Sequence, residues 1–421
     1  MQLNTSNRQS ILWMEWVWAI VIALVLIGAM DMLTNQIDTT LFDGDFVYYL
    51  DMAENGIFEN SHLAAPFAYR PLVPFMARSL ADLFGGSLET GFRIVAWLGA
   101  LLTLVSSYVL ARTFGAEHKL ALFIMIIIAG SFFHLKYLLF DVYRPDHLAY
   151  GLLIVAFLAL LHKQWLACII VSAIGLLTRE FCIIPLVLML LQLLMKVWQG
   201  QKQRGMNMIW ITIGVLVILA FVLLPRLLLP IEMTFVYATL FKPDPTAIET
   251  VTLPLTSIRR NLNLLFAMIA YILPLIWLAG WAQLKEAWHS LGELRWLVGG
   301  YMLMVLGLTL IGGTDLARFV TYLHIPLIIF SAILLKHDTP RILLVGLFGT
   351  LIIFNRLPFQ IPQENYNHFI DFYGAYHDRI NPAIIARWQE LIVFLFLAVG
   401  IRGGLAIIAR ERDAKIAATE S

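Results

Sequence analysis

Long apolar runs recur along almost the whole chain, and they constrain its fold more than any other feature. A run of about 20 apolar residues is long enough to cross the hydrocarbon core of a membrane as a helix. The chain has 421 residues, of which 60% are hydrophobic and 14% are charged, whereas a soluble domain carries about 25% charged residues. The runs are continuously apolar and do not alternate as in a transmembrane β-barrel. The sequence therefore predicts an all-α polytopic membrane protein.

Counting these runs predicts about twelve transmembrane helices. They lie at 11–33, 92–112, 119–139, 147–162, 164–178, 181–198, 207–229, 262–281, 296–312, 319–335, 341–355 and 388–409. No internal repeat or change of composition divides the chain, so we expect a single integral membrane domain over 1–421. We expect short amphipathic helices in the outer loops, of which the first is 34–91 and the last, rich in aromatic residues, is 356–387.

The positions of Lys and Arg predict the orientation in the membrane, because cytoplasmic connections are enriched in these residues. With the N-terminus inside, the inner connections are short and basic, with Lys163, Lys196 and Arg410 among their residues. Both termini are then cytoplasmic, and the clusters of polar residues face outward. The formal net charge of +1 and the absence of a basic stripe argue against a nucleic-acid partner. The expected partners are membrane lipids and lipid-linked molecules.

The first polar cluster follows the first apolar run directly. Asp43, Gly44 and Asp45 can start a helix that ends near Gly56, since glycine tolerates the left-handed conformation found at helix ends. Asp45 and Tyr49 then share one helix face. Either aspartate can be a functional carboxylate, or one can merely cap the helix. Together, Asp43 and Asp45 can also bind Mg²⁺ or Mn²⁺ through oxygen ligands.

Arg70 lies in the segment Pro66-Phe67-Ala68-Tyr69-Arg70-Pro71, where the following proline restricts its backbone to extended conformations. A rigidly held arginine can bind a phosphate through two parallel hydrogen bonds. Alternatively, the segment is a loop-to-helix corner at the membrane surface, where Arg70 faces lipid headgroups.

Asp141, Arg144 and Asp146 lie between two apolar runs. Charges this close to hydrocarbon are costly unless they form ion pairs or line a wet cavity, so they are candidates for a functional site. The alternative is a purely structural ion pair of Arg144 with Asp141 or Asp146 that joins two helix ends.

Two further clusters interrupt apolar segments in the same way. Arg179 and Glu180 can form a local pair or line a cavity. Asp315 and Arg318 follow two glycines, so they can either pair across one helical turn or help to bind an anion at a helix N-terminus.

The last outer loop is rich in aromatic and histidine side chains. Such residues form the aromatic belt at a membrane interface, although aromatic faces can also stack on sugar rings. The residues are Tyr366, His368, Phe369, Phe372, Tyr373, Tyr376 and His377.

The order of these motifs resembles the bacterial GT-C superfamily of polytopic glycosyltransferases. The motifs are GDFVYYLDMAENG and PFAYRPLVP after the first span, TRE between spans, and GGTDLARF before a later span. The resemblance implies transfer of a sugar from a polyprenyl-phosphate donor to a glycan, lipid or protein acceptor on the outer face of the membrane. It implies a catalytic base at Asp45 or Asp43. Some members carry Asp-Glu at this point and a large soluble C-terminal domain, and this chain has neither, which leaves metal use and acceptor class open.

From the chemistry that the resemblance implies, we expect the other polar residues to bind the substrates. Arginines would bind the phosphate, and the neighbouring side chains would complete the site; they are Tyr49, Arg70, Asp141, Arg144, Asp146, Arg179, Glu180, Asp315 and Arg318. The expected location is the bacterial inner membrane, in cell-envelope synthesis. A transporter or flippase of lipid-linked sugars is the alternative function, but it should place charges in mid-span or on both sides. An O-antigen-type polymerase and a non-catalytic assembly subunit are further alternatives.

Overall fold

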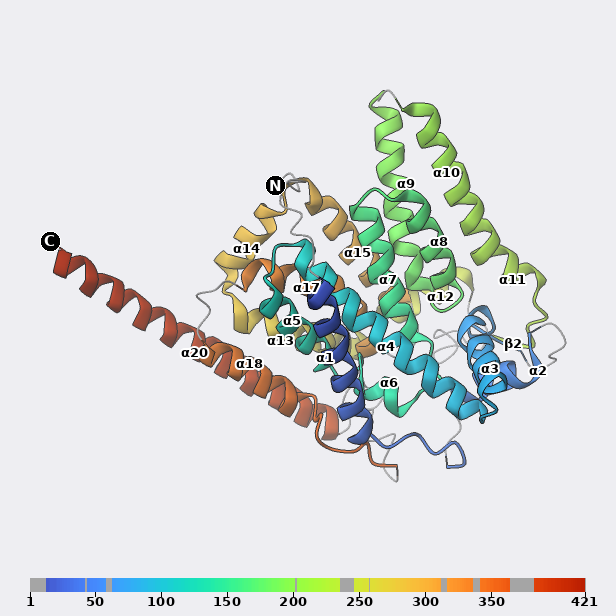
Figure 1. Ribbon diagram of the computed structural model, residues 1–421, viewed down its shortest axis with the longest axis horizontal. Helices are drawn as coiled ribbons and strands as arrows, with labels where there is room; N and C mark the ends of the chain where they lie inside the picture. Colours follow the sequence, from blue (N-terminus) through green and yellow to red (C-terminus); the bar gives the residue numbers. More distant parts are fainter. Residues whose placement is uncertain are drawn as a thin grey trace.

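The computed structural model describes residues 13–41, 44–57, 63–200, 203–234, 246–256, 258–311, 316–335, 341–363 and 382–420. Helices make up nearly all the secondary structure of this part of the chain (Figure 1). Its strands, β1 (Ala64–Ala65) and β2 (Met233–Thr234), form one short parallel pair. The all-α architecture expected from the apolar runs is thus found.

Eight helical segments are long and apolar enough to cross a membrane, counted over the described residues. Four of them are single helices, α1 (Trp13–Met32), α4 (Leu88–Thr113), α13 (Ile258–Leu278) and α20 (Pro382–Glu420). The other four are η3 (Glu180–Cys182) with α9 (Ile183–Trp198), α10 (Arg204–Ile218) with η4 (Leu219–Leu223) and α11 (Leu224–Leu228), η6 (Gly292–Leu294) with α15 (Arg295–Ile311), and α16 (Leu316–Val320) with η7 (Thr321–Leu323) and α17 (His324–Leu334).

Four of the predicted runs form helices that contain only a shorter apolar segment. These helices are α5 (His118–Ala129), α7 (Asp146–Leu161), α8 (Trp165–Leu176) and α18 (Arg341–Phe354). The structure therefore supports a polytopic membrane protein, whereas the count of twelve crossings stays a prediction.

The run expected at 119–139 is not one helix. It breaks after Ala129, and a second short helix, α6 (Lys136–Phe140), follows a series of turns. Lys136 is fully buried, and its ammonium group donates to the main-chain carbonyls of Arg356 and Leu357 (2.8 and 2.9 Å). The break thus brings a buried cation to main-chain carbonyls in the turns that follow α18, which satisfy its hydrogen bonds.

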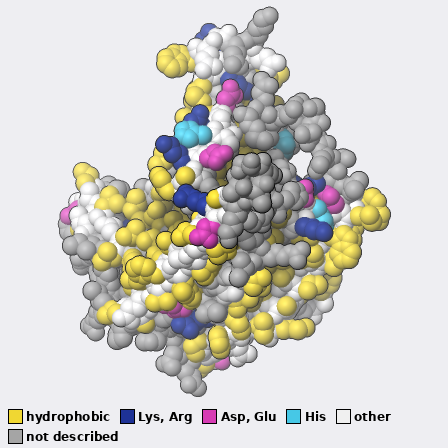
Figure 2. Space-filling view, turned by 90° about the vertical axis from the view of Figure 1, so that its left-hand side faces the viewer, with side chains coloured by type: hydrophobic (Ala, Val, Ile, Leu, Met, Phe, Trp, Pro, Cys, Tyr) yellow, Lys and Arg dark blue, Asp and Glu magenta, His cyan; other side chains and the backbone are white. Residues whose placement is uncertain are grey.

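Large apolar side chains remain exposed on several long helices. Only 17% of the apolar stretch of α1 is buried, and only 11% of the apolar stretches in α10–α11 and in α20. Hydrophobic side chains cover much of the described surface in Figure 2. Water disfavours an exposed apolar surface of this size, whereas lipid chains do not, and exposed apolar patches of this kind mark sites of membrane or protein contact. This surface indicates a membrane-embedded protein.

Several helices outside the spans complete the fold. They are α2 (Phe46–Asn55), η2 (Phe67–Tyr69), α3 (Leu72–Phe84), α12 (Ala247–Thr256) and α14 (Trp281–Ser290). Helix α2 ends at Gly56, which has a φ of 77°, as expected for a residue without a side chain. Helices α2 and α3 form the expected short helices of the segment 34–91.

Close helix packing fixes the centre of the bundle. A Cβ atom on Gly99 of α4 would lie 2.7 Å from the carbonyl carbon of His147 in α7. A Cβ atom on Gly91 would lie 2.0 Å from the carbonyl oxygen of Ala77 in α3. Glycine therefore lets both α7 and α3 approach the backbone of α4 more closely than any larger residue would.

Ion pairs mark the two ends of the α1–α4 helix pair. Glu15 and Arg112 pair at one end (3.2 Å), and Asp31 and Arg93 pair at the other (2.5 Å). The polar segments before α3, before α7, between α8 and α9, and at the start of α16 all occur at helix termini. They meet in one network of side chains, described next.

Candidate functional site

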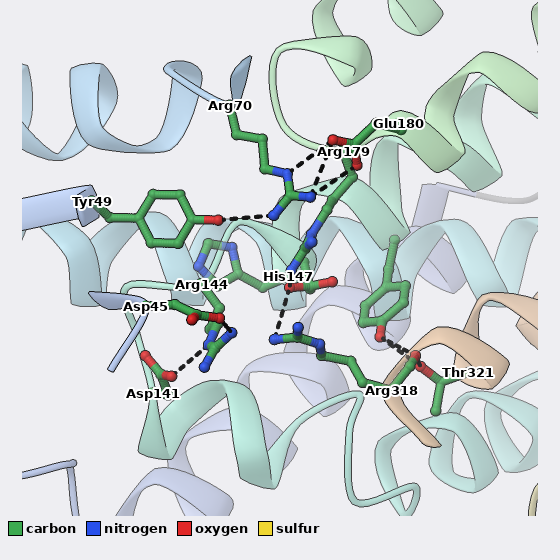
Figure 3. A network of polar contacts seen from close by, with 12 residues as sticks. Asp45, Tyr49, Arg70, Asp141, Arg144, His147, Arg179, Glu180, Arg318 and Thr321 are labelled. Atoms are coloured by element: carbon green, nitrogen blue, oxygen red, sulfur yellow. Dashed lines mark hydrogen bonds and ion pairs between the residues drawn. The ribbon is translucent and has the colours of Figure 1, made fainter. Parts of the chain in front are cut away.

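Arg144 binds two carboxylates from different parts of the chain (Figure 3). Its Nε donates to Asp141 Oδ2 (2.6 Å), and its Nη1 donates to Asp45 Oδ2. The Asp141 side chain is 1% exposed, whereas that of Asp45 is 39% exposed. One arginine thus connects a buried carboxylate with an accessible one.

Packing of α2 places Asp45 beside Arg144. Phe46 and Tyr49 of α2 are buried, and the Phe46 ring lies 5.8 Å from the ring of Tyr143. Asp45 stands at the N-cap position of α2, but its side chain makes no capping hydrogen bond. The interpretation of Asp45 as a simple helix cap is therefore wrong, because its carboxylate pairs with Arg144 instead.

Arg70 forms the second group of contacts. Its guanidinium binds both carboxylate oxygens of Glu180 (3.1 Å each), and its Nη1 donates to the hydroxyl of Tyr49 (3.2 Å). Arg70 is buried, with 6% of its surface exposed. The alternative in which Arg70 faces lipid headgroups is therefore wrong: its side chain turns into the protein and pairs with a residue 110 positions away.

Asp146, the first residue of α7, forms the third group. Its Oδ2 accepts from Arg179 Nη2 (2.5 Å) and lies 3.7 Å from Arg318 Nη1. Its Oδ1 accepts from the hydroxyl of Tyr322 (2.9 Å). Asp146 is fully buried, and buried charges are tolerated when they are paired and hydrogen-bonded in this way.

The three groups form one network with balanced charge. Among the described residues, four arginines face four carboxylates, and the charges of these ion pairs cancel. The members are Arg70, Arg144, Arg179, Arg318, Asp45, Asp141, Asp146 and Glu180. Figure 3 shows the four arginines together with Asp45, Asp141 and Glu180 converging on a common space. Asp45 and Glu180 are the accessible carboxylates, with 39% and 35% of their side chains exposed.

The network perturbs the acidity of its members outside the spans. Burial alone would raise the pKa of Asp45, but the charges of Arg144, Arg318 and Arg179 outweigh it and hold this pKa below its ordinary value. Burial raises the pKa of Asp141 above its ordinary value despite the opposing effect of Arg144. An ionised Asp45 is thus stabilised by cations.

The pairing differs from the local alternatives suggested by the sequence. Arg179 and Glu180 do not pair with one another, since Arg179 binds Asp146 and Glu180 binds Arg70. Arg144 pairs with Asp141, as one alternative predicts, but it also reaches Asp45. Long-range contacts therefore dominate this site.

Sequence reasoning missed several buried polar residues of the site. Tyr322 binds Asp146, and the hydroxyl of Tyr150 contacts Thr321 Oγ1 (2.5 Å). His147 ends the polar segment that begins at Asp141 in the sequence, but it had no predicted role; it is buried beside Asp146, and its Nε2 lies 3.3 Å from the carbonyl of Val142. A tyrosine inside an apolar run signals such a contact, because a buried hydroxyl needs a hydrogen-bond partner.

Some predicted site residues lie outside the described part of the chain. Asp43 and Asp315 belong to this group. So do the aromatic and histidine residues of the last outer loop, from Tyr366 to His377. Their predicted roles remain predictions.

The described residues offer little to a divalent cation. No group of three or more His, Cys, Asp or Glu side chains that could hold a metal occurs among them. Asp45 and Asp141 already share Arg144, whose positive charge would repel a second cation at that point. This part of the site does not fit Mg²⁺ or Mn²⁺, whereas Asp43 is not among the described residues.

A cavity adjoins the network on the side of α13 and α18. Thr321, which contacts Tyr150, is part of its wall. Most of the other lining side chains are apolar or aromatic, among them Phe132, Phe133, Phe266 and Leu327. The polar network thus has a small cavity with a largely apolar lining beside it.

Comparisons of the chain with protein-family models, with curated proteins and with solved structures found no match.

Proposed function

We propose that this protein is a membrane glycosyltransferase that takes a sugar from a polyprenyl-phosphate donor. The observation that carries the proposal is the position of Asp45, a partly exposed carboxylate beside a buried network of four arginines. A transferase of this class needs a base for the acceptor and fixed cations for a phosphate leaving group. The network supplies both kinds of group within one site.

Asp45 takes the proton from the hydroxyl of the acceptor, whose oxygen attacks the anomeric carbon of the donor sugar. The bond from that carbon to the phosphate oxygen breaks, and the polyprenyl phosphate leaves with the electron pair. A positioned base contributes about 10²- to 10⁴-fold in rate. A single displacement inverts the anomeric centre; a product that keeps the configuration of the donor would exclude this mechanism.

The arginines stabilise the charge that grows on the leaving phosphate. A fixed hydrogen-bond donor at such a charge is worth about 10²- to 10³-fold in rate. Arg144 and Arg70 lie beside the accessible carboxylates, so they are placed to reach the substrate. The hydrocarbon of the donor, like that of membrane lipids, suits the exposed apolar surface of the long helices.

The proposed location is the bacterial inner membrane, with the network on the outer face and both termini in the cytoplasm. The density of basic residues in the short connections supports this orientation. Reporter fusions at the C-terminus test it. If a C-terminal fusion to a reporter that works only outside the cytoplasm is active, this orientation is excluded.

Sugar transfer from a pool of radiolabelled polyprenyl-phosphate donors tests the function. We expect Asp45→Asn to lower transfer by about 10²- to 10⁴-fold, and Asp43→Asn to show whether the neighbouring aspartate shares the role. The matched control is Asp51→Asn on the same helix, where the carboxylate accepts from the exposed side chain of Asn55 (2.7 Å). Transfer at the wild-type rate in Asp45→Asn would remove this residue from the chemistry. Movement of the lipid-linked sugar across the membrane without transfer would instead support a flippase.

A further inference from the structure

Arg144 is shared by two carboxylates that differ in their freedom to leave it. Asp141 is 1% exposed and binds Nε at 2.6 Å from three residues away in the chain. Asp45 is 39% exposed and comes from the start of α2, 99 positions away. Moving Asp141 would uncover a buried charge, whereas the partly exposed Asp45 can turn toward solvent when another anion takes its place at Arg144. Asp141 is therefore the anchor of Arg144, and Asp45 is its exchangeable partner.

The charge of the network indicates what can replace Asp45. Among the described residues the network pairs four arginines with four carboxylates, so an anion that entered without displacing one of them would be buried without a compensating cation of its own. A phosphodiester, such as a polyprenyl phosphoryl sugar, carries one negative charge. If it displaces one carboxylate from Arg144, the balance of the buried site is preserved.

We propose that the donor phosphodiester replaces Asp45 at Arg144, and that only this exchange frees Asp45 to act as a base. The inference rests on the proposed function and gives the order of its steps: the donor binds before the acceptor is deprotonated. While Asp45 is paired with Arg144, its Oδ2 accepts from a cation and the carboxylate is a weak base. After the exchange, the same carboxylate faces the acceptor, and Asp141 keeps Arg144 on the phosphate.

The cations around Asp45 hold its basicity down before the exchange. Arg144, Arg318 and Arg179, which come from three different segments, outweigh the effect of burial and lower the pKa of Asp45. A bound phosphate screens them, so the pKa of Asp45 rises. Burial and the Asp45 carboxylate both raise the pKa of Tyr48 on α2, so this phenol stays uncharged near neutral pH.

Binding of a simple phosphodiester tests the exchange separately from sugar transfer. The probe is farnesyl methyl phosphate, titrated calorimetrically into the purified full chain in micelles at pH 7 and low salt. If Asp45 competes with the probe, Asp45→Asn should bind it about three- to tenfold more tightly than the wild type. Asp141→Asn should bind it at least about tenfold more weakly, since Arg144 loses its anchor. The control Asp51→Asn should not change the affinity.

The outcomes separate the two proposals. Suppose that the wild type transfers sugar and Asp45→Asn binds the probe no more tightly than the wild type does. This result would overturn the exchange at Arg144 but not the proposed transferase function. Suppose instead that Asp45→Asn binds the probe more tightly but the wild type transfers no sugar. This result would support the exchange as a property of anion binding and would overturn the proposed transferase function. Equal or tighter binding of the probe by Asp141→Asn overturns the role of Asp141 as the anchor. Circular dichroism of each variant shows whether it is folded.

Discussion

Removing the charge of Asp146 should be the most damaging single change in the network. Its carboxylate is fully buried and serves Arg179 (2.5 Å), Arg318 (3.7 Å) and Tyr322 (2.9 Å). Asp146→Asn keeps the shape of the side chain and an oxygen that can accept from Tyr322, but it removes the carboxylate from beside two buried guanidinium groups. Breaking a buried ion pair from one side costs about 3–5 kcal/mol. The unfolding equilibrium should therefore shift by about two to four powers of ten.

The assay is unfolding of the purified protein in mixed micelles, followed by circular dichroism. The matched control is Asp82→Asn, which breaks the pair with Arg78 (3.0 Å), whose side chains are 49% and 63% exposed. An exposed pair of this kind is worth about 0–1 kcal/mol. Adding Arg318→Met to Asp146→Asn removes one of the two buried cations and should restore part of the stability. An Asp146→Asn protein as stable as Asp82→Asn would refute the reasoning that this carboxylate compensates buried cations.

Three further predictions address packing, hydrogen bonding and acidity. Gly99→Ala should lower the free energy of unfolding by about 1–3 kcal/mol, because the new methyl group would lie 2.7 Å from the backbone of His147; the unfolding assay measures this. Tyr49→Phe removes the hydroxyl bound to Arg70 (3.2 Å) and should cost about 1–3 kcal/mol in the same assay. The pH profile of sugar transfer should show a different pKa of Asp45 in the free enzyme and in the donor complex. In the free enzyme, cations hold its pKa below the ordinary value, so kcat/KM should fall only at low pH. In the donor complex its pKa rises, so the acid limb of kcat should lie at higher pH.

The controls for these predictions lie in the same chain. No atom lies within 4 Å of a Cβ added to Gly307 in α15, so Gly307→Ala should leave the stability unchanged or raise it. If Gly307→Ala lost as much stability as Gly99→Ala, the close contact between α4 and α7 would not be the cause of the destabilisation by Gly99→Ala. Tyr49→Phe with wild-type stability would show that Arg70 does not depend on the tyrosine hydroxyl. Superimposable acid limbs for kcat and kcat/KM would contradict a change in the acidity of Asp45 on donor binding.

Much of the architecture follows from local sequence. Apolar runs of sufficient length favour helices in a membrane because every backbone hydrogen bond is then made within the run. For this reason the predicted segments and the observed helices agree closely at α1, α4 and α15. The run 119–139 is the exception. This run is apolar enough to predict one helix, although it contains His134 and Lys136. The side chains of these two residues contact distant residues and are buried where the helix is broken.

The polar residues were recognisable in the sequence for a related reason. Arg70, Asp141, Arg144, Arg179 and Arg318 interrupt or flank apolar segments, where an ionised group requires compensation. That requirement identifies the residues, but it does not identify their partners.

Only the tertiary structure decided which charges meet. Arg179 and Glu180 are neighbours in sequence, yet adjacent residues point in different directions, and each pairs with a residue more than 30 positions away. Asp45 could have capped α2, but the packing of α2 against Tyr143 brings its carboxylate to Arg144. The sequence alone determined that buried charges at these helix ends must be compensated, because the cost of burying a charge is local. Which carboxylate compensates which arginine depends on the helix ends that packing brings together, and therefore on the whole fold.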